Sequence, residues 1–181
     1  EVNALMLKFF DYFLKGIANG MDGHPKVRLE IRESGDQVKE VRDEDQWPPE
    51  NVVWTPFYLN GRDNCLTLEP DVPDAARTFD LAKGSLHYSY TFDRDVEIVG
   101  PLKLTLHIEL EGCDDANLFA GIQKFHLGKE VNFDGTYGFP NDIVTKTALR
   151  VALRTVDEAH STPYSPEYDF DTLKPLKEKE V

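Results

Sequence analysis

Residues 102–110 alternate strictly between apolar and polar side chains. The apolar residues occupy every second position: Leu102, Leu104, Leu106, Ile108 and Leu110. A period of two is typical of a β-strand with one buried face. Small and acidic residues at 111–115 predict a turn, and residues 118–125 follow as a segment with apolar side chains on both faces. We therefore expect these two segments to pair as antiparallel strands within a β-sandwich.

The rest of the chain predicts one helix and a series of short strands. Residues 3–15 carry large apolar side chains at helical spacing, which predicts an amphipathic helix with Asn3 as its N-cap and Gly16 as its stop. Alternation between turn residues predicts strands at 27–32, 53–59, 65–68, 87–92 and 96–98. The pattern at 145–156 fits a helix or a strand, and its β-rich surroundings favour a strand. Loops are predicted at 34–49, 69–84 and 128–141.

Charge and length exclude several classes of partner. The chain has 181 residues, with 33 acidic and 20 basic side chains and a formal net charge of −13. Such a surface repels nucleic-acid phosphates and anionic lipids, so neither nucleic acid nor membrane is an expected partner. No apolar run approaches the roughly 20 residues needed to cross a bilayer. There is neither a signal segment nor an initiating Met, so we expect the chain to begin mid-protein or after processing.

Cysteine usage gives little sign of a disulfide or zinc framework. Cys65 and Cys113 are the two cysteines of the chain. Two free, buried thiols are the favoured interpretation, with a single bridge as the alternative. Few cysteines and no signal segment favour the cytoplasm without excluding another compartment.

Candidate catalytic residues are scattered along the sequence. None of the five serines (Ser34, Ser85, Ser89, Ser161 and Ser165) has glycine two positions before it, so no Gly-x-Ser-x-Gly nucleophile elbow is present. The histidines lie far apart: His24, His87, His107, His126 and His160. Ordinary surface or sheet histidines are favoured over a catalytic base. We therefore expect no catalytic residue in this chain.

Two sets of side chains are candidates for ligand binding. Asp114, Asp115 and Asn117 offer oxygen ligands for a hard cation such as calcium, although a solvated turn with side-chain hydrogen bonds is favoured. No cofactor is expected. An aromatic platform for a sugar or substrate is conceivable on four further residues, for which core or interdomain packing is favoured: Trp47, Trp54, Tyr58 and Tyr137.

Several segments, in order, resemble the C-terminal domain of the CocE/NonD hydrolases, the group that includes cocaine esterase, α-amino acid ester hydrolases and X-prolyl dipeptidyl-peptidases. The similar segments are KFFDYFLKG at 8–16, WTPFYL at 54–59, DDANLF at 114–119, TALR at 147–150, STP at 161–163 and LKPL at 173–176. Asn117 stands where that family usually has a third acid. The similar segments span nearly the whole chain.

This resemblance implies a galactose-binding-like jelly-roll sandwich at 24–181. It also implies that the helix and linker at 1–23 are the end of a preceding α/β-hydrolase domain. It implies that the catalytic serine, acid and histidine belong to that preceding domain. Family members usually continue past the Pro-Leu element with further strands, so the resemblance also implies a sandwich shortened at its C-terminus. Phe9, Phe10 and Phe13 would form the interdomain contact. The wall of the active-site entrance, on the side that faces substrate, would be formed by Trp54, Tyr58, Asp114 and Asp115.

The function implied is therefore a non-catalytic accessory domain that shapes the active-site entrance of a serine ester or amide hydrolase, with X-prolyl peptides among the substrates considered. A free-standing carbohydrate- or calcium-binding sandwich remains the alternative, and a purely structural interaction domain is a third. The sequence is compatible with a homo-oligomer.

Overall fold

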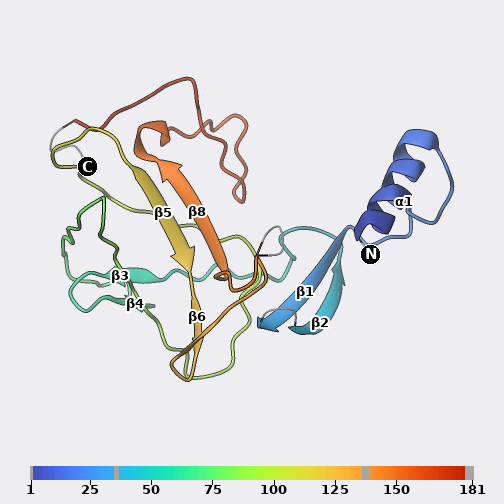
Figure 1. The fold of residues 1–181 in the computed structure, drawn as a ribbon, viewed down its shortest axis with the longest axis horizontal. Helices are drawn as coiled ribbons and strands as arrows, with labels where there is room; N and C mark the ends of the chain where they lie inside the picture. The colour runs from blue at the N-terminus through green and yellow to red at the C-terminus, as the bar shows by residue number, and fades with distance from the viewer. Residues whose placement is uncertain (1, 35–36, 136–138, 178–181) are drawn as a thin grey trace. The chain divides into compact units, whose positions relative to one another are not determined.

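The computed structural model of the protein describes residues 2–34, 37–135 and 139–177. These residues form one α-helix, eight short strands and a 3-10 helix at Val151–Leu153. The elements, labelled in Figure 1 where there is room, are α1 Val2–Lys15, β1 Val27–Ser34, β2 Gln37–Glu44, β3 Tyr58–Asn60, β4 Cys65–Thr67, β5 Asn117–Ile122, β6 Lys124–His126, β7 Lys129–Val131 and β8 Thr145–Arg150. The chain divides into two units, Glu1–Glu50 with Val131–Asp142, and Asn51–Glu130 with Ile143–Val181.

The helix α1 confirms the N-terminal prediction and ends where the sequence indicates. Gly16 has a φ of +67°, a left-handed conformation that favours glycine, and its N–H donates to Tyr12 O at 3.1 Å. The helix begins at Val2, so Asn3 lies inside it and does not cap it, contrary to the prediction. Within the described residues no helix is both long enough and apolar enough to cross a membrane.

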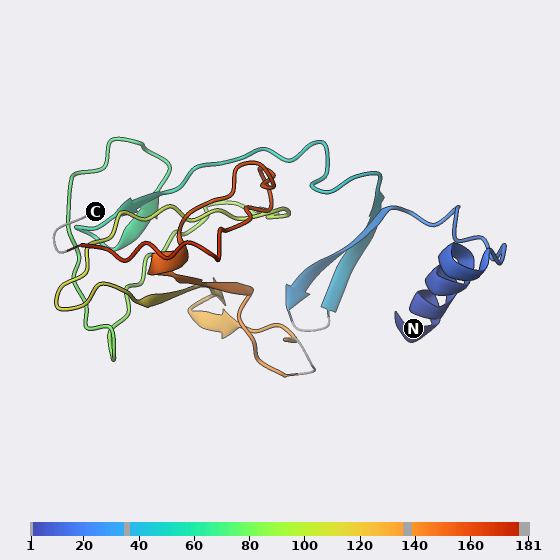
Figure 2. The ribbon, with the colours of Figure 1, turned by 90° about the horizontal axis from the view of Figure 1, so that it is seen from above.

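The strands β1 and β2 form an antiparallel hairpin in the first unit, visible in Figure 2. β1 is the strand predicted at 27–32. β2 lies within the acidic stretch 34–49, for which a loop is predicted, so that prediction is wrong. Val27, Leu29 and Ile31 are half-buried, whereas the β2 side chains are mostly exposed. Opposite charges meet across the ladder where Arg28 pairs with Asp43. Polar composition therefore did not prevent a strand, because an exposed ribbon needs backbone pairing and tolerates charged side chains.

The second unit contains the β3–β4 and β5–β8 ladders, both antiparallel. The predicted strand at 53–59 forms only from Tyr58, and Asn60-Gly61 turns the chain into β4 as expected. The predicted strand at 87–92 is reduced to an isolated bridge between Cys65 and Ser89. β8 confirms the choice of strand at 145–150, after which the chain turns into the 3-10 helix. β7 lies within the predicted loop 128–141, which is therefore not wholly irregular.

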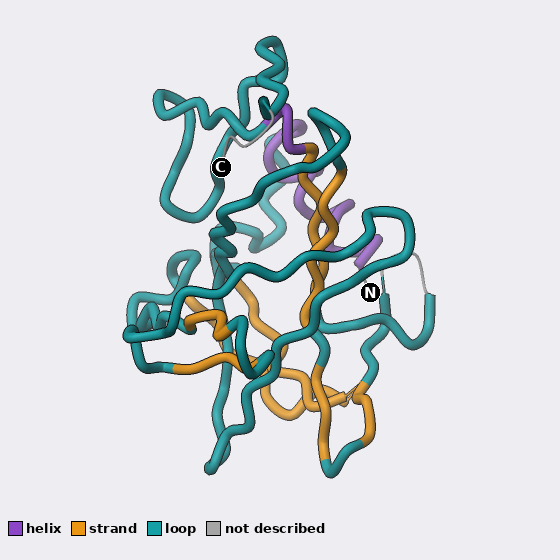
Figure 3. Tube along the Cα trace, turned by 90° about the vertical axis from the view of Figure 1, so that its left-hand side faces the viewer, coloured by secondary structure: helices purple, strands orange, loops and turns teal. Residues whose placement is uncertain are grey.

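The predicted partnership of 102–110 with 118–125 is wrong. β5 forms inside the second segment, but it pairs with β8, and Leu118 faces Leu149 across that ladder. Figure 1 shows β5 and β8 side by side. Residues 102–110 form no strand, and no strand lies between β4 and β5, whose intervening residues are all described. Figure 3 shows that loops make up long stretches of the tube. An alternating pattern indicates which side chains share a face, but it does not specify the neighbour that must supply the hydrogen bonds.

Buried side chains are few among the described residues. Leu110, Val151 and Leu176 form the core cluster, with exposed fractions of 7%, 1% and 3%, and Ala152 is also buried. The two cysteines are free, as favoured, but Cys113 is exposed and only Cys65 is half-buried. The prediction of a mainly β fold with one helix and antiparallel pairing is confirmed.

Candidate functional site

The side chain of Asp115 joins the start of β5 to the end of β8. Its Oδ2 atom lies 2.6 Å from Nε of Arg150. Its Oδ1 atom accepts hydrogen bonds from the backbone N–H groups of Ala152 and Ala116, each at 2.9 Å. Arg150 and Ala152 lie 35 and 37 residues further along the chain. Both carboxylate oxygens are therefore engaged within the chain, and this side chain links two distant segments.

Backbone hydrogen bonds bring the C-terminal segment to the same place. The N–H of Leu176 donates to Asp114 O at 2.8 Å, and the N–H of Lys174 donates to Ala152 O at 2.8 Å. The guanidinium of Arg154 also donates to Lys174 O. The place where these segments meet, which we call the motif junction, combines three of the segments that resemble the hydrolase family: 114–119, 147–150 and 173–176. Their sequence similarity thus coincides with a shared structural role.

The arginine beside Asp115 lowers the pKa of that carboxyl group below its usual range, with the hydrogen bonds from Ala152 and Ala116 as smaller contributions. A lowered pKa in the folded state stabilises the fold above the unfolded pKa of about 3.9. This contribution is lost as the pH falls through the lowered folded-state pKa. Substituting Asp115→Asn should therefore lower the unfolding midpoint at pH 7, and the difference from the wild type should shrink as the pH falls through the lowered pKa of Asp115.

Urea unfolding at several pH values measures this effect. Asp114→Asn is the matched control, because Asp114 is the adjacent acid and its side chain is exposed. Equal losses at pH 7 for the two variants would contradict the role assigned to Asp115.

The stacked rings of Trp54 and Tyr164 connect two further segments that resemble the hydrolase family. The rings of Trp54 and Tyr164 lie 6.2 Å apart between centroids and are parallel to within 3°. Trp54 belongs to the segment 54–59, and Tyr164 follows directly on 161–163. Both side chains remain about half exposed, at 50% and 46%. One face of the Trp54 ring is thus occupied within the chain.

The other ligand-binding candidates are not brought together. Tyr58 is half-buried in β3, while Trp47 lies in the first unit and is about half exposed. Tyr137 lies outside the described residues. Asp114 and Asn117 are exposed beside Asp115, whose carboxylate is already bonded to Arg150. In the described ranges, no group of three or more His, Cys, Asp or Glu side chains could hold a metal ion.

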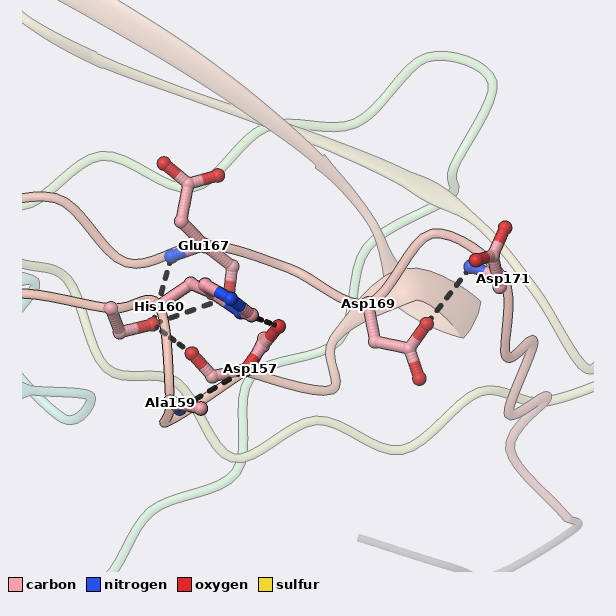
Figure 4. A network of polar contacts seen from close by, with 7 residues as sticks. Asp157, Ala159, His160, Glu167, Asp169 and Asp171 are labelled. Carbon is pink, nitrogen blue, oxygen red and sulfur yellow. Dashed lines mark hydrogen bonds and ion pairs between the residues drawn. The ribbon is translucent and has the colours of Figure 1, made fainter.

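Two serine–histidine arrangements occur, and neither forms a catalytic triad. Ser85 Oγ lies 2.9 Å from His87 Nε2 in an exposed segment, and no carboxylate of the described residues contacts that imidazole. In the second arrangement, drawn in Figure 4, Asp157 Oδ2 lies 2.6 Å from His160 Nδ1. Ser161 Oγ donates to the backbone oxygen of Asp157 at 2.6 Å and accepts from the N–H of Glu167 at 2.9 Å. This serine is therefore bonded to backbone groups, and its hydroxyl is not oriented toward the imidazole as a nucleophile would be.

The Asp157–His160 pair was not singled out from the sequence, although an acid three residues before a histidine is a recognisable spacing for an ion pair. The hydrogen bond that the imidazole of His160 donates to Asp157 raises the pKa of His160, and the negative charges of Asp157 and Glu167 add to the effect. The same hydrogen bond lowers the pKa of Asp157. The pair lies at the start of the segment that leads to Tyr164.

We expect the imidazole of His160 to titrate above the unperturbed value of about 6.5, because its protonated form is bonded to Asp157. Its stabilising contribution is complete below that value and is lost as the pH rises through the raised pKa. NMR titration of the His160 ring protons measures this pKa directly. Asp157→Asn should return the midpoint toward 6.5, whereas Glu158→Gln at the exposed neighbouring position should leave it largely unchanged. A wild-type midpoint at or below 6.5 would contradict the ion pair.

The helix α1 presents an exposed aromatic face, defined here as Phe9, Phe10 and Phe13. Their exposed fractions are 43%, 46% and 60%. The rings contact one another, with centroids 4.6 Å apart for Phe9 and Phe13 and 5.5 Å apart for Phe9 and Phe10. A different side of the helix is used within the unit, where Asn19 Nδ2 donates to Lys8 O at 2.7 Å. The aromatic face therefore remains available for contact.

A shallow apolar hollow of about 540 Å³ lies over one face of the β5–β8 ladder. The register places Phe119 opposite Ala148 and Gly121 opposite Lys146 on that face. A Cβ atom on Gly121 would meet Ile143 Cδ1 at 2.5 Å, so glycine permits this close approach. The residues that line the hollow supply no nucleophile and base in contact with each other.

The sequence and fold identify the chain as the C-terminal domain of a class of hydrolases. Residues 19–181 match the family model described as the X-Pro dipeptidyl-peptidase C-terminal non-catalytic domain. The chain belongs to this family, which forms the C-terminal part of CocE/NonD hydrolases. Over 61 residues it is 39% identical to cocaine esterase of Rhodococcus sp. (strain MB1 Bresler), covering 34% of this chain and 10% of that esterase.

Solved structures extend the similarity to almost the whole chain. A crystal structure of a CocE/NonD family hydrolase from Staphylococcus aureus superimposes with a TM-score of 0.84 at 30% identity, covering 96% of this chain and 32% of the hydrolase. A second crystal structure of that hydrolase gives a TM-score of 0.73 at 28% identity, covering 98% and 32%. The chain thus spans about a third of the length of these hydrolase chains. The family resemblance inferred from the motifs is confirmed.

Proposed function

We propose that this chain is the accessory C-terminal jelly-roll domain of an α/β serine hydrolase that cleaves esters or amides, including X-prolyl peptides as candidate substrates. Catalysis would take place on a preceding α/β domain of the same polypeptide. The observation that carries this proposal is the exposed aromatic face of α1, in a chain that belongs to a family of non-catalytic C-terminal domains.

Binding of a partner to the aromatic face of α1 is favourable because it removes apolar surface from water. Contiguous exposed aromatic side chains are uncommon on a monomer, because each square ångström of apolar surface removed from water contributes about 25 cal/mol. The rings of Phe9, Phe10 and Phe13 already contact one another, so they can enter a partner surface as one unit. The relatives in the comparisons are hydrolases about three times as long as this chain, which supports a hydrolase domain as that partner.

The substrate-side wall belongs to the same proposal. Trp54, Tyr58, Asp114 and Asp115 would together face the active-site entrance; Trp54 and Asp114 are exposed, and Tyr58 and Asp115 are half-buried. The bond from Asp115 to Arg150 would then fix the position of Asp114. In this arrangement the motif junction supports a surface that touches substrate without taking part in bond breaking.

Hydrolysis of a short-chain aryl ester by the purified 181-residue chain tests the assignment of chemistry to another domain. We expect no turnover that depends on a serine of this chain. The variants Ser161→Ala and Ser85→Ala remove the two serines nearest to a histidine and serve as controls. Turnover by the wild-type chain that either substitution abolishes would refute the proposal.

A further inference from the structure

The segment 54–57 is held by ring contacts and not by backbone hydrogen bonds. Between the residues that the structure describes, the backbone of 53–57 makes no hydrogen bond to another backbone group. The ring of Trp54 stacks on that of Tyr164, and the ring of Phe57 lies edge-on to that of Tyr90, with centroids 5.0 Å apart. The orientation of the half-exposed Trp54 ring therefore depends on where Tyr164 is held.

Tyr164 lies in a loop, 157–167, whose two ends are fastened together. The N–H of Asp157 donates to Glu167 O at 2.8 Å. The hydroxyl of Ser161 donates to Asp157 O at 2.6 Å and accepts from the N–H of Glu167 at 2.9 Å, so it bonds to both ends of the loop. Figure 4 shows part of this network. The loop is thus closed at its base independently of Trp54.

A tight turn at the tip of this loop carries the ring of Tyr164. The N–H of Thr162 donates to Ser165 O at 3.0 Å, and the N–H of Ser165 donates back to Thr162 O at 3.3 Å. Pro163, whose ring restricts φ, stands directly before Tyr164. The phenol hydroxyl makes no hydrogen bond to a described residue, so the side chain of Tyr164 contributes its ring face.

We propose that Tyr164 is a positioning residue of the active-site entrance, which holds the indole of Trp54 so that the other face of the indole contacts an apolar ring of the substrate. The inference rests on the proposed function, which assigns Trp54 to the wall of that entrance. Aromatic faces stack well on flat apolar groups, and an indole fixed in advance loses less conformational freedom on binding. The proline ring of an X-prolyl peptide and the ring of an aromatic ester both have this shape.

Steady-state hydrolysis by the natural polypeptide that carries this chain tests the inference on ethyl benzoate and ethyl acetate, of which only the benzoate has a ring. Tyr164→Leu should raise KM for the benzoate about 2- to 10-fold, the effect of losing one ring stack. We expect kcat, and KM for the acetate, to stay unchanged, because the contact binds ground state and transition state alike. If neither ester is cleaved, an X-prolyl amide replaces the benzoate.

Two control variants separate the ring stack from other effects. Tyr164→Phe keeps the ring and removes only the hydroxyl, so it should retain the wild-type KM. Phe170→Ala removes a ring that is 68% exposed in the same part of the chain, and it should also leave KM unchanged. An equal rise of KM in Phe170→Ala and Tyr164→Leu would overturn the inference.

Fluorine NMR of the polypeptide labelled with 5-fluorotryptophan reports the stack without relying on activity. The signal of Trp54 is the one lost in Trp54→Phe, and Tyr164→Leu should shift it. An unshifted signal would overturn the positioning role. A shifted signal with unchanged KM would also overturn the inference, while the proposed hydrolase function would stand. Failure of the wild-type polypeptide to cleave the esters and the X-prolyl amide would refute the proposed function and, with it, the substrate contact.

Discussion

Substituting Phe9→Asp and Phe13→Asp together is expected to release α1 from the hydrolase domain in a polypeptide that carries both. Phe9 and Phe13 are 43% and 60% exposed in this chain, so about half of each side chain remains to be buried on docking. Burying that half contributes about 1.5–3 kcal/mol for the pair. Each new carboxylate would add several kcal/mol of desolvation cost at the contact. The expected result is a lower unfolding temperature of the polypeptide and rapid proteolysis near residues 16–25.

The variant Leu7→Asp provides the matched control for this prediction. Leu7 is 61% exposed and is separated from Phe9 by about 160° around the helix axis. It introduces one carboxylate into the same helix away from the two substituted rings, so it controls for the loss of helix propensity that each substitution causes. Limited proteolysis followed by mass spectrometry compares the two. Equal cleavage of the Leu7 and Phe9/Phe13 variants would show that the aromatic face is not the docking surface.

Leu176→Ala is expected to destabilise the chain by about 2–5 kcal/mol, the usual range for truncating a buried leucine to alanine. Leu176 is 3% exposed and packs with Leu110 and Val151. Because so few side chains are buried, each of them carries a large share of a total stability that is about 5–15 kcal/mol in most domains. The segment around Leu176 should then separate from the motif junction, and its amides should lose protection.

Leu173→Ala tests whether burial is the cause. Leu173 belongs to the same Leu-Lys-Pro-Leu element but is 53% exposed. Its substitution removes the same number of carbon atoms and should cost less than about 1 kcal/mol. Urea denaturation followed by circular dichroism measures both variants. A larger loss from Leu173→Ala than from Leu176→Ala would contradict the core described here.

Local sequence patterns predicted the elements whose stop signals, turns and backbone hydrogen bonds all lie within a few residues of one another. The helix α1 follows from its apolar repeat and the left-handed Gly16, and the β3–β4 hairpin follows from Asn60-Gly61. β5 also arises where both faces of the chain are apolar, although its partner was misassigned. These predictions depend on local periodicity and turn chemistry, which the sequence displays directly.

Pairing between distant segments could not be read in the same way. The alternation at 102–110 indicates a strand, but no ladder forms there among the described residues. β2 was missed because its charged composition resembled a loop. The contact from Asp115 to Arg150 spans 35 residues, and nothing at either position specifies the other. The segments 114–119 and 147–150 both resemble the hydrolase family, but that resemblance does not indicate that they contact each other.

Hydroxyl-radical footprinting of Phe9, Phe10 and Phe13 tests the central claim most directly, because oxidation reports the solvent exposure of each ring. The comparison is between the 181-residue chain and a polypeptide that also carries the proposed hydrolase domain. Our account predicts that oxidation of all three rings falls several-fold in the longer polypeptide, while that of the exposed Phe170 serves as a reference. Equal oxidation of the three rings in both proteins would contradict the account.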